Sequence, residues 1–234
     1  SRKHEGIERY ARLVHGHGSG HVQVMENGAI LECDALAGQK TGYFFDQRPN
    51  RSWVGSLCEG RAVLDLFAYV GAFAVQALKA GAAHVTSVDA SQSALHWASR
   101  NVARLGAENR WEAIRGDMPR VLHDLGQQKR RFDIVICDPP AFVKSRSKRQ
   151  AGLRGYQGLA RSCAALVRAE GLLCAASCSG LIDMDEFRLA TLKGIREAGR
   201  SAQIVHVGEA GADHPWLPSM PETRYLKFMA WRLD

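Results

Sequence analysis

The stretch AVLDLFAYVGAF, residues 62–73, contains the transition that decides the fold. Its first five residues, Ala62 to Leu66, form an apolar run of strand length, and Ala72 to Ala80 carry apolar residues at helical spacing. Gly71 stands between the two, where its lack of a side chain lets the backbone approach a ligand closely. The stretch therefore predicts a strand, a short loop and a helix, which is the repeating unit of an α/β sheet.

The same alternation of short apolar segments and amphipathic segments continues to the C-terminus, and it predicts a parallel sheet with helices on both faces. We expect strands at Ala62 to Leu66, His84 to Asp89, Trp111 to Arg115, Phe132 to Asp138, Gly171 to Ser177, Ala202 to Val207 and Tyr225 to Arg232, and helices at Ala72 to Ala80, Ser91 to Leu105, Leu159 to Ala169 and Asp183 to Ala198. No helix separates the last two strands, which should form an antiparallel hairpin at the sheet edge. The expected fold class is α/β, with a Rossmann-like mixed sheet of seven strands.

The residues that precede this sheet have a different pattern. Two apolar runs, Val22 to Met25 and Ala29 to Asp34, flank Glu26-Asn27-Gly28. Asn-Gly is a strong signal for a tight hairpin turn, because both residues tolerate the positive φ that the turn requires. We therefore expect residues 1–52 to be a small N-terminal segment that contains a β-hairpin, and residues 53–234 to be the main domain.

The composition restricts the classes of function. With 234 residues and 46% hydrophobic content, the chain can bury a full core. A formal net charge of +7 favours a polyanionic partner such as RNA, although a merely basic soluble protein has the same charge. The chain begins at Ser1 without a methionine, as a processed or truncated chain would.

The six cysteines form no Cys-x-x-Cys pair and have no neighbouring histidines at metal-binding spacing. This pattern is typical of reduced thiols, so we expect a cytoplasmic protein without a metal site. No apolar run approaches the length of about eighteen residues that a membrane helix needs, which argues against a membrane role.

Acidic residues lie at or just after the ends of four predicted strands, where an open α/β sheet binds its ligands. Asp65 lies near the end of the first strand, and Asp89 ends the second, where a carboxylate can accept hydrogen bonds from both hydroxyls of a ribose. Asp117 follows the third strand, so its carboxylate or the Met118 amide can contact an adenine edge. Asp138 ends the fourth. The four acids predict a nucleoside-containing cofactor.

The loops between these strands and helices indicate which cofactor it is, and they add Phe67, Gly71 and Ser91 to the predicted contacts. A nicotinamide dinucleotide would need several glycines to approach its pyrophosphate, and that pattern is absent from the sequence. S-adenosylmethionine has no phosphate, so a loop with one glycine and bulky neighbours suits it better. For any one acid, helix capping is the alternative explanation. Four acidic residues at corresponding strand ends favour an S-adenosylmethionine site.

Asp138-Pro139-Pro140 predicts a rigid turn at the reacting edge of the sheet. The two prolines fix φ and remove backbone donors, so the turn offers only acceptors. Acceptors suit the amino group of a nucleobase. Asp138 is therefore a predicted catalytic residue as well as a cofactor contact, and Pro139 and Pro140 are predicted substrate contacts.

Cys178 follows the fifth strand, beside this turn, and is the candidate nucleophile. Carbon 5 of cytosine reacts poorly with a methyl donor until a thiolate adds to carbon 6, and loss of the carbon 5 proton later expels the thiolate. Asp138 would hold the ring while charge develops. The alternative is that Cys178 is only a small buried residue at a strand end.

The loop after the fourth strand is strongly basic, which indicates RNA binding. Lys144, Lys148 and Arg149 are predicted to contact phosphates, and Phe142 a base. A solvated loop without a partner is the alternative.

Taken together, these motifs resemble the RlmI-type family of bacterial large-subunit ribosomal RNA cytosine-C5 methyltransferases. The resemblance runs from about Asn27 to the C-terminus, through Gly38-Gln39-Lys40-Thr41-Gly42, Asp46-Gln47-Arg48, Asp65 to Phe73, Ser87-Val88-Asp89, Asp138-Pro139-Pro140, Ser177-Cys178-Ser179-Gly180, Asp213-His214-Pro215 and Tyr225-Leu226-Lys227. It implies a class I methyltransferase fold, S-adenosylmethionine as methyl donor, and Cys178 as nucleophile. It also implies that Gln47 and Arg48 reach the cofactor.

Two departures from the family pattern matter. Nothing in the sequence corresponds to the family's N-terminal RNA-binding PUA domain, and Ala141 follows the Asp-Pro-Pro turn where lysine is common. Two other functions stay open: an amino-group methyltransferase acting on guanine, which needs no thiol, and a noncatalytic RNA-binding module. The sequence leaves open the oligomeric state, including a homodimer.

Overall fold

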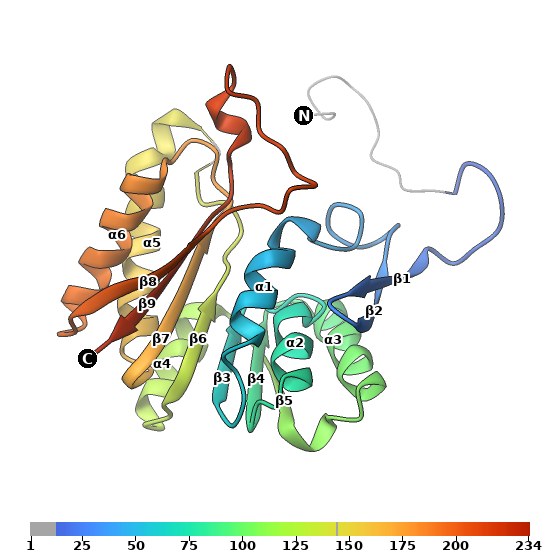
Figure 1. The fold of residues 1–234 in the computed structure, drawn as a ribbon, viewed down its shortest axis with the longest axis horizontal. Helices are drawn as coiled ribbons and strands as arrows, with labels where there is room; N and C mark the ends of the chain where they lie inside the picture. Colours follow the sequence, from blue (N-terminus) through green and yellow to red (C-terminus); the bar gives the residue numbers. More distant parts are fainter. Residues whose placement is uncertain (1–12, 144) are drawn as a thin grey trace.

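The computed structural model describes residues 13–143 and 145–234. Within them, a mixed sheet has the strand order β5-β4-β3-β6-β7-β9-β8, as Figure 1 shows. Its strands are β3 (Ala62–Leu66), β4 (His84–Asp89), β5 (Trp111–Arg115), β6 (Phe132–Cys137), β7 (Val167–Ser177), β8 (Ala202–Gly208) and β9 (Lys227–Leu233). The α-helices are α1 (Arg48–Gly55), α2 (Ala72–Lys79), α3 (Gln92–Arg104), α4 (Met118–Gln127), α5 (Arg149–Ala164) and α6 (Met184–Glu197). The predicted seven-stranded α/β fold is confirmed.

The pairing of the strands explains where ligands can bind. The strands from β5 to β7 run parallel, whereas β9 is antiparallel to both β7 and β8. The predicted hairpin at the sheet edge is therefore confirmed, with β8 outermost. Because the five parallel strands end at the same edge, the loops that follow them converge there.

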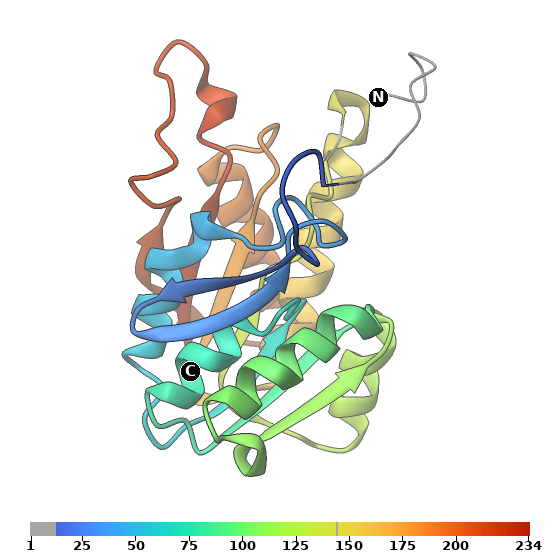
Figure 2. The same ribbon diagram turned by 90° about the vertical axis from the view of Figure 1, so that its right-hand side faces the viewer.

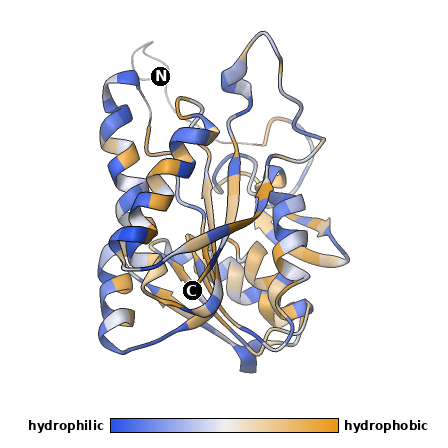
Figure 3. Ribbon diagram, turned by 60° about the vertical axis from the view of Figure 1, so that its left-hand side comes forward, coloured by the Kyte–Doolittle hydropathy of each residue, from blue (hydrophilic) through white to orange (hydrophobic). Residues whose placement is uncertain are grey.

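Two layers of helices cover the sheet. Helices α1, α2 and α3 bury apolar side chains on one face, and α4, α5 and α6 bury theirs on the other. Figure 3 shows the hydrophobic residues gathered along the strands and the inner sides of the helices, with hydrophilic residues outside. None of the helices in the described residues is long and apolar enough to cross a membrane.

The N-terminal hairpin consists of β1 (His21–Glu26) and β2 (Ala29–Asp34), as predicted. Its turn has φ of 48° at Asn27 and 72° at Gly28, which is the left-handed conformation that Asn-Gly accommodates. The hairpin lies against α2 and α3 (Figure 2), and its Leu31 and Cys33 join their apolar core. The predicted boundary at residue 52 falls inside α1.

The helix predictions for α4 and α5 were wrong in part. No helix was predicted at 118–127, because Pro119 and Gly126 weaken the helical pattern there. Proline is nevertheless tolerated in the first turn of a helix, where Pro119 lies. Helix α5 begins at Arg149, ten positions before the predicted start, and it ends before β7 begins. Its glycines lower helix propensity, but they also allow close packing: a Cβ at Gly152 would lie 2.2 Å from Val143.

Candidate active site

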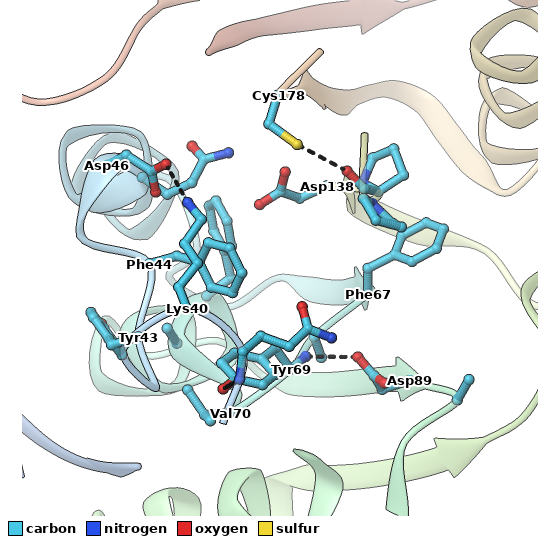
Figure 4. A pocket seen from close by; sticks show the side chains of 18 of the residues that line it. Lys40, Tyr43, Phe44, Asp46, Phe67, Tyr69, Val70, Asp89, Asp138 and Cys178 are labelled. Carbon is cyan, nitrogen blue, oxygen red and sulfur yellow. Dashed lines mark hydrogen bonds and ion pairs between the residues drawn. The ribbon is translucent and has the colours of Figure 1, made fainter. Parts of the chain in front are cut away.

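A cavity of about 340 Å³ opens at the ends of the parallel strands, and its volume lies within the usual range of small-molecule sites, roughly 300–1,000 Å³. Its walls come from the loops after β3, β4, β5, β6 and β7, and from the segment that links the hairpin to α1 (Figure 4). Of the residues predicted from sequence, it is lined by Gln47, Phe67, Asp89, Asp117, Met118, Asp138, Pro139, Pro140 and Cys178.

Asp89 is fixed by the backbone around it. One carboxylate oxygen accepts a hydrogen bond of 2.9 Å from the Tyr69 amide, and the other accepts one of 2.8 Å from the Ser91 amide. These bonds hold the carboxylate in one orientation while its remaining lone pairs face the cavity. Two oxygens presented in this way can accept both hydroxyls of a ribose, as predicted for Asp89.

The loop after β3 enters the cavity in an unusual backbone conformation. Phe67 and Tyr69 have φ of 61° and 50°. Left-handed conformations at bulky residues cost energy and persist where the surrounding structure holds them in place, often at ligand sites. The strain here brings two aromatic residues to the cavity wall.

Asp117 and Met118 lie at the start of α4. Asp117 is the N-cap residue of this helix, but its side chain makes no capping hydrogen bond within the described residues. The carboxylate is therefore not used for capping, and Asp117 lies on the cavity wall. Met118 supplies an apolar surface next to it. This pair suits the polar edge and the flat face of an adenine.

Asp65 lies in the interior and does not line the cavity, although it was predicted to contact the cofactor. Burial, with a smaller contribution from the nearby Asp138 carboxylate, raises its pKa to about 8. One of its oxygens has no hydrogen-bond partner among the described residues. Asp65 is thus a largely protonated acid near neutral pH, placed behind the reactive groups.

Cys178 and Asp138 meet at the reacting edge. The Cys178 thiol lies 3.9 Å from the Pro139 carbonyl oxygen, toward which it can donate a weak hydrogen bond. Burial raises the pKa of the Cys178 thiol, and Asp138 adds to this increase. Burial also raises the pKa of Asp138 to about 6, with Asp46 adding to the increase and Arg51 opposing it. The predicted nucleophile and its predicted partner therefore share one cavity.

Ser179 joins the two loops that carry these groups. Its hydroxyl accepts a hydrogen bond of 3.3 Å from the Val143 amide, in the loop after the Asp-Pro-Pro turn. The same hydroxyl lies 2.8 Å from the Tyr156 hydroxyl of α5, which in turn accepts a bond from Ser177. The turn and the cysteine loop are therefore held in a fixed relation to each other.

Lys227, at the start of β9, was not predicted as part of the site. Its ammonium group is buried and donates hydrogen bonds of 2.6–2.8 Å to the carbonyl oxygens of Ser179, Ile182 and Tyr225. Burial lowers the pKa of Lys227 to about 8. Three carbonyl acceptors on one buried donor fix the path of the chain directly after Cys178.

Arg51 and Glu26 form a buried ion pair beneath the cavity that sequence reasoning also missed. The guanidinium group makes two hydrogen bonds of 2.6 Å to the Glu26 carboxylate and a third of 2.8 Å to the Phe44 carbonyl oxygen. The Tyr43 hydroxyl donates to the same carboxylate at 3.0 Å. This network attaches the hairpin to the cavity wall, where Arg51 is a lining residue.

Three further residues predicted to bind the cofactor lie, like Asp65, outside the lining. A Cβ on Gly71 would meet Ala98 of α3 at 2.9 Å, so this glycine permits close helix packing rather than approach to a ligand. The Ser91 hydroxyl accepts a hydrogen bond from the Ala94 amide and caps α3. Arg48 forms an ion pair of 3.3 Å with Asp213, in the loop between β8 and β9.

The predicted RNA contacts are only partly brought to the cavity. Phe142 packs against Tyr156 with 4.8 Å between ring centroids, and it is not among the lining residues. Arg149 forms an ion pair of 2.5 Å with Glu186 of α6, while Lys148 is exposed at the end of the same loop. Lys144 lies outside the described residues.

The cavity suits S-adenosylmethionine by the chemistry of its walls. Asp89 offers two oriented oxygens, Asp117 an uncapped carboxylate, and Phe67 and Met118 apolar surface. No group of three or more potential metal ligands occurs in the described part of the chain. The walls therefore suit the ribose and the adenine ring of this cofactor.

A family model described as S-adenosylmethionine-dependent methyltransferase matches residues 9–232. The chain belongs to this family. Curated relatives of this methyltransferase include ribosomal RNA large subunit methyltransferase I from Alteromonas mediterranea, 37% identical over 97% of the chain, and its namesake from Aeromonas salmonicida, 34% identical over 99%. The chain spans 57% and 59% of the length of these two relatives.

Solved structures share the fold of this methyltransferase. The protein SMU.776 in complex with SAH has a TM-score of 0.81 and 23% identity, covering 94% of this chain and 58% of that one. A SAM-dependent methyltransferase from Agrobacterium tumefaciens has a TM-score of 0.70 and 19% identity, covering 94% and 72%. At these identities the likeness establishes the fold.

Proposed function

We propose that this methyltransferase modifies carbon 5 of a cytosine in large-subunit ribosomal RNA, with Cys178 as the nucleophile. The proposal rests on the position of Cys178. Its thiol faces the cavity beside the Pro139 carbonyl oxygen, whereas the other five cysteines are buried. An amino-group methyltransferase would have no use for a thiol at this position.

The chemistry follows from the two reactive side chains. The Cys178 thiolate adds to carbon 6 of the ring, a carbon–sulfur bond forms, and the electrons of the double bond make carbon 5 nucleophilic. S-adenosylmethionine, when bound, supplies the electrophilic methyl group that carbon 5 takes up. A base then removes the proton from carbon 5, and the electrons of that C–H bond form the double bond between carbons 5 and 6 again. The carbon–sulfur bond breaks at the same time, and its electron pair leaves with the Cys178 thiolate.

Asp138 is the group that we assign to the ring. Its carboxylate can accept a hydrogen bond from the cytosine amino group, and with a pKa raised to about 6 it can share a proton with the adjacent ring nitrogen as charge develops. The Pro139 and Pro140 turn keeps this acceptor in place without offering competing donors.

The relatives support ribosomal RNA as the substrate, since those named above are large-subunit ribosomal RNA methyltransferases. The net charge of +7 and the exposed cations from Arg146 to Arg149 are consistent with a polyanionic partner. We infer RNA as the partner and the cytoplasm as the location on these grounds.

The proposal is tested with a substrate that stops the last step. A large-subunit rRNA transcript containing 5-fluorocytidine is incubated with the protein and S-adenosylmethionine. Because fluorine cannot leave carbon 5 as a proton does, the covalent adduct should accumulate and survive denaturing electrophoresis. Cys178→Ala should give no adduct. An absent adduct with the wild-type chain, or an adduct that persists in the variant, would overturn the assignment.

A further inference from the structure

Two of the residues that line the cavity carry a positive charge, and they differ in how far that charge is already neutralised. Arg51 is buried and makes a bidentate pair with Glu26. Lys40 forms a single ion pair of 3.2 Å with Asp46, and its side chain is 51% exposed. The Lys40 ammonium group is thus the more available of the two cavity cations.

The loop that carries Lys40 has a shape that directs the side chain. The Gly38 amide donates to the Asp34 carbonyl oxygen at 2.9 Å, and the Gln39 amide donates to the Tyr69 hydroxyl at 2.9 Å. A Cβ at Gly38 would lie 2.2 Å from the Asp34 oxygen, so glycine is required there. Lys40 itself has φ of 52°, a conformation that a lysine adopts only when its surroundings hold it.

The ammonium group is held by contacts at the cavity wall. It lies 4.4 Å from the centroid of the Phe44 ring, and Asp46, its ion-pair partner, is only 2% exposed. The Tyr225 hydroxyl donates to the same Asp46 oxygen at 2.7 Å. Tyr225 therefore fixes the carboxylate that fixes the lysine. Figure 4 shows the side chains of Lys40, Asp138 and Cys178 arranged around the same space.

The charges around Cys178 oppose each other. Burial is the main cause that raises the pKa of its thiol, and Asp138 and Asp46 add to it, whereas Lys40 lowers it. The titratable groups that interact with Cys178 come from several elements around it. They are Asp138 after β6, Asp46 in the turn before α1, Lys40 in the segment between the hairpin and that turn, Tyr156 on α5, and Tyr225 and Lys227 at β9. Lys227 is occupied by three carbonyl oxygens.

We propose that the Lys40 ammonium group supplies the positive charge that stabilises the Cys178 thiolate, and that Asp46 and Tyr225 hold it in place. Lys40 acts through Cys178, and this inference rests on the proposed role of Cys178 as nucleophile. A thiolate beside a carboxylate in a partly buried cavity needs a compensating cation, and Lys40 is the lining residue placed to provide it.

The experiment measures the charge state of Cys178 without RNA or turnover. Because the other five cysteines are buried, iodoacetamide should alkylate Cys178 selectively, and mass spectrometry identifies the site. The alkylation rate follows the thiolate fraction, so its dependence on pH reports the thiol pKa. Rates are compared for the wild type, Lys40→Met, Lys40→Gln, Lys40→Arg and, as a matched control, Lys193→Met on the exposed side of α6.

The neutral variants Lys40→Met and Lys40→Gln should alkylate about three- to tenfold more slowly at neutral pH, because a shift of one pKa unit changes the thiolate fraction tenfold. Lys40→Arg, which keeps the charge, should restore most of the rate, and Lys193→Met should behave as the wild type. Equal pH profiles for the wild type and both neutral variants would overturn the proposal.

A second outcome would also overturn the proposal. If Lys40→Arg is alkylated as slowly as Lys40→Met, the shape of the lysine side chain, and not its charge, determines the reactivity of Cys178. These outcomes are distinct from failure of the proposed function, which is judged by the adduct of the wild-type chain with 5-fluorocytidine RNA. A wild-type adduct together with unchanged alkylation in the Lys40 variants would leave Cys178 as nucleophile and remove Lys40 from its activation.

Discussion

The two halves of the cavity hold their carboxylates in different ways. On the side of β4 and β5, Asp89 is fixed by two backbone amides. On the side of β6 and β7, Asp138 has no backbone amide partner among the described residues, and burial raises its pKa to about 6. This difference fits the roles that we propose for the two residues. A carboxylate held by backbone amides is oriented for binding, whereas one with a pKa raised toward neutral pH can take part in proton transfer.

The largest effect that can test this comparison comes from the reactive half. Cys178→Ala should reduce methyl transfer to RNA by at least about a thousandfold, because removing a covalent nucleophile removes its whole pathway. Affinity for S-adenosylmethionine, measured by calorimetry, should stay within a few fold. Full activity in this variant would instead favour methylation of an amino group.

A substitution on the side of β4 and β5 should instead affect cofactor affinity and leave the reactivity of Cys178 unchanged. Asp89→Ala should weaken binding of S-adenosylmethionine by about ten- to a hundredfold, since hydrogen bonds to a charged group contribute about 1.5–3 kcal/mol. The rate of Cys178 alkylation should not change. Asp124→Ala, which removes an exposed carboxylate from α4, is the control and should bind normally. If Asp89→Ala also alters alkylation, the two halves are not independent.

Asp65 interacts with the carboxylates of both halves, Asp89 and Asp138. Its protonation should affect the stability of the folded chain. Because its pKa is about 8 in the folded chain against an ordinary value of 3.8, its proton is bound more tightly when the chain is folded. The stability that this proton provides is complete below about pH 4 and is lost as the pH rises toward 8.

Asp65→Asn cannot lose a proton there. Between pH 5 and pH 8, the thermal midpoint of this variant should therefore gain roughly 7–14 °C relative to that of the wild type, measured by calorimetry. A constant difference between the two proteins across this range would show that Asp65 does not titrate with a raised pKa.

The smallest effect is expected outside the cavity, in the basic loop. Lys148→Glu should weaken binding of a large-subunit rRNA fragment a few fold and reduce the salt slope by roughly 0.7–0.9 for each lost phosphate contact. Lys193→Glu on α6 makes the same charge change away from the cavity loops. Identical salt slopes for the two variants would leave the loop without a specific role.

From the positions of the strands, the sequence predicted residues in both halves of the site, but not those in the segment that links the hairpin to α1. Asp89, Asp117, Asp138 and Cys178 each end or follow a strand that can be recognised in the sequence, and parallel strands bring such residues to one edge. Lys40 could not be found in this way. It lies in a segment without periodicity, and its place depends on how the hairpin packs against α2 and α3.

Other misses have equally physical causes. Phe142 was expected to contact a base because it is an aromatic residue in a basic loop. Glycines in α5 open a space into which its ring packs: a Cβ at Gly155 would lie 2.8 Å from Phe142. Gly71 was assigned to ligand approach, yet the same absence of a side chain serves the contact with α3. Sequence shows that a glycine is present, but not which neighbour needs the space.

The ion pair between Glu26 and Arg51 has a consequence for the alignment of the hairpin. Glu26 pairs with Ala29 across the turn, directly beside Asn27 and Gly28. If the strands slipped by one position, the carboxylate would turn to the opposite face and leave a buried guanidinium without its counter-ion. An uncompensated buried charge of this kind costs several kcal/mol. The ion pair thus favours a single register of the hairpin. Because Arg51 also lines the cavity, a change in this register would disturb the cavity wall.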